Sequence, residues 1–103
     1  MGNTTDEEGG IIMLKYKFEE YKNRFSVYVG FEEIGYIDFF PTGDVWIIED
    51  TYVEAATNEK ELMLQMIDMF VNEARKKKKK LIVLDSLVKR VFAKNLKYND
   101  IIS

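Results

Sequence analysis

The apolar residues of this chain change their spacing once, close to residue 58, and that change is the strongest constraint on its fold. Before it, apolar and polar residues alternate with a period of two, which is typical of strands that bury one face. After it, apolar residues recur at intervals of three and four, which predicts a helix of roughly 20 residues, from 58 to about 77, with one buried stripe. The stripe consists of Leu62, Met63, Met66, Ile67, Phe70 and Ala74. We therefore expect a layer of strands covered by one long helix.

Four strands are predicted ahead of the helix, at 14–19, 25–29, 34–40 and 45–53. The links at 21–24 and 41–44 are short, and their residues suit a hairpin and a turn. The four strands are therefore expected to form an antiparallel meander.

A fifth strand is predicted after the helix, from the apolar run at 81–84, which is typical of a covered parallel strand. A strand, a helix and a strand in that order cross over right-handedly. Asp85 or Ser86 then caps a short C-terminal helix. The fold class is therefore α+β. It comprises a mixed sheet of about five strands, in which a parallel fifth strand follows the antiparallel meander after a long crossover helix.

The length of 103 residues fits one domain. We expect a flexible tail over 1–12, because the chain begins with polar, acidic and glycine-rich residues, and a single domain over 13–103. The chain starts without the basic stretch and apolar run of a secretory signal. No apolar run approaches the ~18 residues that span a bilayer. A cytoplasmic protein without membrane contact is the expectation.

The composition excludes several kinds of chemistry. The chain contains no cysteine and no histidine. Disulfides, cysteine nucleophiles, zinc sites built on imidazole and histidine-based triads are therefore excluded. We predict no metal site.

The order of elements over residues 51–102 resembles the small single-domain members of the GNAT superfamily of acetyl-CoA-dependent N-acetyltransferases. A strand end, a loop, a long helix, a short strand and a short helix follow one another, and Tyr98, Asn99 and Asp100 form the closing Tyr-x-Asp. Thr51 and Val53 keep the Thr-x-Val step ahead of the loop. The resemblance implies acetyl-CoA as cofactor, bound where the fourth and fifth strands splay apart. It also implies an amine acceptor, either a small molecule or a protein.

The resemblance also assigns coenzyme contacts to the end of the fourth strand and to the loop and helix start that follow. These contacts are Ile48, Thr51, Val53, Asn58, Glu59, Lys60, Glu61 and Met63. The family loop is of the type R/Q-G-x-G-x-G/A, whereas here residues with side chains occupy every glycine position, which makes a degenerate pyrophosphate loop. Glu59 and Glu61 place carboxylates where phosphates are expected, against the usual preference of such sites. The same residues also suit an ordinary capped helix start, with Glu61 three positions after Asn58.

Three catalytic candidates follow from the resemblance. Asp50 stands where relatives carry the histidine of a His-Thr pair, Asp85 where they carry a cysteine, and Tyr98 opens the closing Tyr-x-Asp. Carboxylates and a phenol can serve as base and acid in amine acetylation. Each residue also has a structural explanation. Asp50 suits a solvated strand position, Asp85 a helix cap and Tyr98 a half-buried aromatic position.

Six consecutive cations at 75–80 raise the question of nucleic-acid binding. Successive positions wrap around the last turns of a helix, where cations are favoured by the helix dipole, so nucleic-acid binding is disfavoured.

Two functions remain open. The first is an acetyl-CoA-dependent N-acetyltransferase whose acceptor the sequence does not identify. The second is a non-catalytic GNAT-fold binding or assembly module that has lost acetyl-CoA, which predicts a captured partner or a stable oligomer such as a homodimer.

Overall fold

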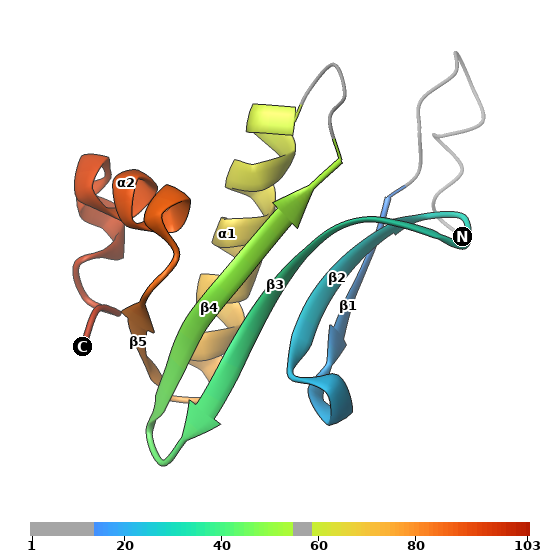
Figure 1. Cartoon of the computed structure of the whole chain (residues 1–103). Helices are drawn as coiled ribbons and strands as arrows, with labels where there is room; N and C mark the ends of the chain where they lie inside the picture. The colour runs from blue at the N-terminus through green and yellow to red at the C-terminus, as the bar shows by residue number, and fades with distance from the viewer. Residues whose placement is uncertain (1–13, 55–58) are drawn as a thin grey trace.

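The computed structural model describes residues 14–54 and 59–103, and within these ranges five strands form one sheet (Figure 1). The elements are β1 (Lys15–Glu19), β2 (Arg24–Val29), β3 (Glu32–Thr42), β4 (Val45–Val53), α1 (Glu59–Lys76), β5 (Lys80–Val83) and α2 (Ser86–Lys94). Short 3-10 helices lie at Glu20–Lys22 and Leu96–Tyr98. The predicted tail over 1–12 and the predicted cap Asn58 lie outside the described residues.

The strands follow one another in the sheet in chain order. Pairs from β1 to β4 are antiparallel, and β4 pairs with β5 in parallel after the crossover through α1. The predicted α+β class, with a meander of four strands and a parallel fifth, is therefore confirmed.

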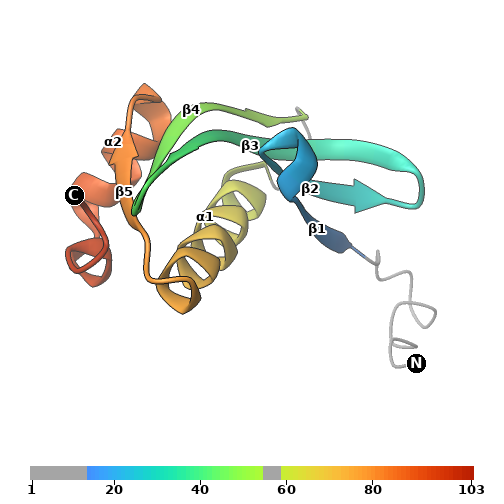
Figure 2. The ribbon, with the colours of Figure 1, turned by 90° about the horizontal axis from the view of Figure 1, so that it is seen from below.

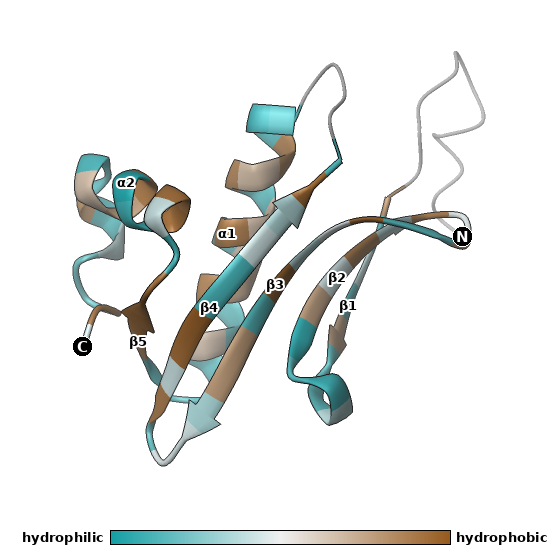
Figure 3. Ribbon diagram, viewed as in Figure 1, coloured by the Kyte–Doolittle hydropathy of each residue, from teal (hydrophilic) through white to brown (hydrophobic). Residues whose placement is uncertain are grey.

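The core lies between the sheet and α1. Figure 2 shows the sheet arched over this helix, and Figure 3 shows apolar residues alternating with polar ones along the strands. Phe70 of α1 is fully buried, and its ring centroid lies 5.2 Å from that of Phe39 and 5.5 Å from that of Trp46. Met66 and Ala74 are also fully buried, as the helical stripe predicts. No helix in the described part of the chain is long and apolar enough to cross a membrane.

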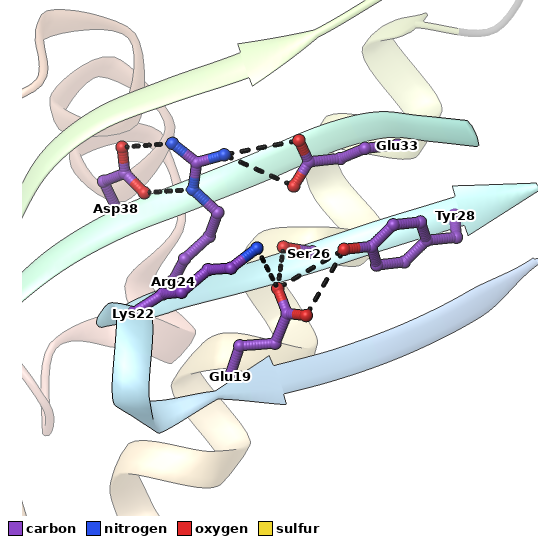
Figure 4. Close-up of polar contacts among 7 residues, drawn as sticks. All are labelled: Glu19, Lys22, Arg24, Ser26, Tyr28, Glu33 and Asp38. Carbon is purple, nitrogen blue, oxygen red and sulfur yellow. Dashed lines mark hydrogen bonds and ion pairs between the residues drawn. The ribbon is translucent and has the colours of Figure 1, made fainter. Parts of the chain in front are cut away.

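The opposite face of the sheet is held by polar contacts across β1, β2 and β3 (Figure 4). The Arg24 guanidinium donates to both carboxylate oxygens of Asp38, at 2.6 and 3.1 Å, and also reaches Glu33. The Ser26 hydroxyl donates to the buried Glu19 carboxylate at 2.8 Å. These contacts link side chains of neighbouring strands on the face of the sheet that lies away from α1.

The cations at 75–80 have partners within the chain. Arg75 donates to both carboxylate oxygens of Asp100, at 3.0 and 2.7 Å, and so ties the end of α1 to the C-terminal segment. Lys77 reaches Glu20 at 2.9 Å, and Lys80 donates to the backbone carbonyl of Asp100 at 2.6 Å. These structural contacts explain much of the run, and the absence of nucleic-acid binding stays a prediction.

Candidate active site

The parallel pairing of β4 and β5 stops halfway along β4. It joins 45–48 to 80–83, and the last bond runs from the Leu84 amide to the Ile48 carbonyl at 2.9 Å. β4 continues to Val53, whereas the other chain segment turns into α2 after Asp85. In the described residues, the edge of β4 over 49–53 is therefore not paired with β5, which is the divergence that the resemblance implies.

A β-bulge lies at the same place. Asp38 pairs with Asp50 and Phe39 pairs with Ile48, so Glu49 has no partner on β3 in this register. Bulges re-aim side chains and are frequent beside active sites.

A cleft of about 640 Å³ opens where the strands diverge. Its walls are the end of β4, the first turns of α1 and one side of α2. The lining residues are Thr51, Val53, Glu59, Lys60, Met63, Leu64, Leu87, Arg90, Val91, Lys94 and Asn95. The volume lies within the range of roughly 300 to 1,000 Å³ that is usual for small-molecule sites.

The first turn of α1 contains the two carboxylates, Glu59 and Glu61, that are expected at the phosphate position. Glu59 lines the cleft beside Lys60, whereas Glu61 is exposed and is not among the described lining residues. Residues two apart on a helix do not share a face. One carboxylate therefore faces the cleft where the sequence suggests two.

The α2 wall carries residues that are absent from the predicted site. Leu87, Arg90, Val91 and Lys94 recur at intervals of three and four and face the cleft, while Val88 is buried beneath them in the core. Two cations thus stand one turn apart beside two apolar side chains. This spacing is visible in the sequence, but the resemblance directs attention to the loop before α1.

Five of the predicted coenzyme contacts come together in the cleft, namely Thr51, Val53, Glu59, Lys60 and Met63. Ile48 is only 1% exposed and packs its side chain in the core. Asn58 lies outside the described residues. The coenzyme contacts themselves stay predictions.

Asp85 links the two sides of the cleft. Its Oδ2 accepts from the Val88 amide at 3.0 Å, which confirms the predicted helix cap, and from the Thr51 hydroxyl at 3.2 Å. Among the described residues Oδ1 has no hydrogen-bond partner. Asp85 is therefore a cap that also places one carboxylate oxygen at the point where β4 and β5 part.

The other two catalytic candidates lie elsewhere. Asp50 is exposed at the bulge of β4. Tyr98 is 2% exposed, stacks on Phe92 with ring centroids 4.7 Å apart, and donates its hydroxyl hydrogen to Asp68. Neither residue is among the described lining residues of the cleft. Asp85 is not among them either, but of the three candidates it alone is hydrogen-bonded, within the described residues, to a lining residue, Thr51.

Burial, followed by the hydrogen bond to Asp68, raises the pKa of Tyr98 above its ordinary value of 10.0. A raised folded-state pKa contributes stability that is present below pH 10.0 and is lost as the pH rises toward the folded value. We expect wild type to exceed Tyr98→Phe in unfolding free energy by about 1 kcal/mol at neutral pH. That difference should shrink between about pH 9 and about pH 11 in urea unfolding curves. A difference that stays constant over this range would contradict the prediction.

The cleft has a positive balance of charge. Lys60, Arg90 and Lys94 line it against the single carboxylate of Glu59. Within 14–54 and 59–103, none of these three cations forms an ion pair. The same ranges contain no group of three acidic residues placed to hold a metal ion.

Comparison with known proteins identifies the family of the chain. Residues 24–101 match the GCN5-related N-acetyl-transferase (GNAT) family. The chain therefore belongs to this family, which confirms the resemblance inferred from residues 51–102.

Among solved structures, the fold is similar to the NMR solution structure of a GCN5-like protein from Staphylococcus aureus, described as a candidate N-acetyltransferase. The TM-score is 0.69, with 19% sequence identity over 89% of this chain and 88% of that chain. This likeness supports the fold. None of the curated proteins matches the chain.

Proposed function

We propose that the protein is an N-acetyltransferase that binds acetyl-CoA in the cleft between β4, α1 and α2. The observation that carries the proposal is a cleft of about 640 Å³ at the strand divergence, with apolar and cationic side chains on its walls. The family membership supports acetyl-CoA as the acyl donor. Val53, Leu87 and Val91 offer an apolar surface to the pantetheine arm, and the unpaired edge of β4 offers backbone groups to its amides.

Acetyl transfer forms a bond between the amine nitrogen and the thioester carbon and breaks the carbon–sulfur bond. The amine loses one proton to a base, and the departing thiolate regains one from solvent. We assign the base to Asp85, because its Oδ2 is bonded to the cleft residue Thr51 and to the Val88 amide, while its Oδ1 has no hydrogen-bond partner among the described residues. Asp50 and Tyr98 are the remaining candidates. The acceptor is an amine, carried by a small molecule or a protein.

Titration with acetyl-CoA tests the proposal. In ¹⁵N-labelled protein, we expect backbone amide shifts to change over 51–53, 59–64 and 87–95, because these segments line the cleft. Amides of β1, on the far edge of the sheet, serve as the internal control. A ligand with millimolar affinity binds with only about 4 kcal/mol, so the titration should extend to that concentration. An unchanged spectrum there would refute coenzyme binding and point to the module that has lost acetyl-CoA.

A further inference from the structure

We propose that the phosphate groups of the coenzyme are held by cationic side chains of α2, Arg90 and Lys94, assisted by Lys60 of α1. This inference rests on the proposed function, since it assigns the anion-binding part of the same cleft. In this arrangement, side-chain donors on α2 take the part that the backbone amides of a glycine-rich loop before α1 take in the family pattern.

The first support comes from the side of α2 that faces the cleft. Arg90 and Lys94 are four residues apart and both line the cleft. Side chains at this spacing are neighbours on one helix face. The same face carries Leu87 and Val91, so a ligand that lies along α2 meets an apolar surface and then two positive charges. This sequence of surfaces matches a molecule with an apolar arm joined to a phosphorylated end.

The second support comes from the charges of the side chains that line the cleft. Three cations line the cleft with one carboxylate, Glu59: Lys60 stands beside it on α1, and Arg90 and Lys94 lie on the α2 wall. In the part of the chain that the structure describes, the three form no ion pairs that a phosphate would have to break. An arginine guanidinium binds phosphate through paired hydrogen bonds, and such charge-assisted bonds are stronger than neutral ones. A diphosphate therefore finds compensation for the Glu59 charge.

The helix dipole explains the position of only one of the two cations on α2. Lys94 lies in the last turn of α2, where the helix dipole favours a cation. Arg90 lies in the middle of the helix and has no such explanation. Lys89, its neighbour, lies on another side of α2, where it lines a separate shallow groove with Phe92 and Ala93. Lys89 is therefore a matched control for charge on the same helix.

Binding of two acyl donors tests the inference. S-acetylpantetheine shares the acetyl group and the pantetheine arm with acetyl-CoA but has no phosphate. We expect the double variant Arg90→Ala, Lys94→Ala to bind acetyl-CoA about 100-fold more weakly, roughly tenfold for each cation. Its affinity for S-acetylpantetheine should equal that of wild type, and Lys89→Ala should bind both ligands normally. Calorimetry or amide shifts give the dissociation constants, and thermal unfolding verifies that each variant is folded.

The outcomes separate this inference from the proposed function. If wild type and the double variant bind acetyl-CoA equally, the coenzyme binds in some other way and the α2 assignment is wrong. If wild type binds neither donor, both proposals fail. A loss of affinity in the double variant that is equal for the two donors also rejects the assignment, because S-acetylpantetheine carries no phosphate.

Discussion

Replacing Phe70 by alanine should lower the free energy of unfolding by about 3 to 5 kcal/mol, a large share of the roughly 5 to 15 kcal/mol that stabilises a typical domain. Phe70 is fully buried, and its ring lies against Phe39 and Trp46 of the sheet. Removal of the ring leaves a cavity between α1 and the sheet that a close-packed core fills poorly. Chemical unfolding monitored by the fluorescence of Trp46, the single tryptophan, measures the loss.

Met69→Ala is the matched control. Met69 precedes Phe70 on α1 but is 39% exposed. We expect its replacement to cost about 1 kcal/mol or less. Equal losses in the two variants would show that the buried ring does not fix α1 to the sheet.

The buried face of α1 could be predicted because helical spacing and burial are directly linked. Met66, Phe70 and Ala74 are all fully buried, as the spacing requires. The ends of the strands are harder to predict from this spacing, because backbone pairing extends beyond the apolar residues. β3 begins at Glu32, two residues before the predicted start, since its first residues pair with the end of β2.

Contacts between distant segments could not be predicted from spacing. Arg24 meets Asp38 only because the register of β2 and β3 places them opposite each other. Arg75 meets Asp100 because the C-terminal segment returns beside β5, where Leu81 and Ile102 form a bridge. Neither pairing has a local signal in the sequence.

In the candidate site, too, some residues could be predicted from the sequence and others depend on the fold. Thr51, Val53 and Lys60 are named by the family resemblance and do line the cleft. Arg90 and Lys94 depend on the rotation of α2 about its own axis, which its packing through Val88 and Phe92 determines. The resemblance therefore indicates which strand and helix line the cleft, whereas the charge of the opposite wall requires the fold.

Asp85→Asn should leave the fold intact and lower the rate of acetyl transfer about 100-fold or more, because an amide cannot accept the amine proton. Asparagine is as good a helix cap as aspartate, and its carbonyl oxygen can accept from the Val88 amide and the Thr51 hydroxyl. Asp85→Ala should lose both the transfer activity and about 1 kcal/mol of stability. Single-turnover rates at saturating acetyl-CoA, measured beside thermal unfolding, separate these two effects.

Ser86→Ala provides the control, because Ser86 is the neighbouring exposed residue at the start of α2. Its rate of transfer should match wild type. If Asp85→Asn also transfers acetyl groups at the wild-type rate, Asp85 serves only as a cap and as the link to Thr51. The base must then be one of the other two candidates, and Asp50, which stands exposed on β4 at the bulge beside the strand divergence, is more accessible than the buried Tyr98.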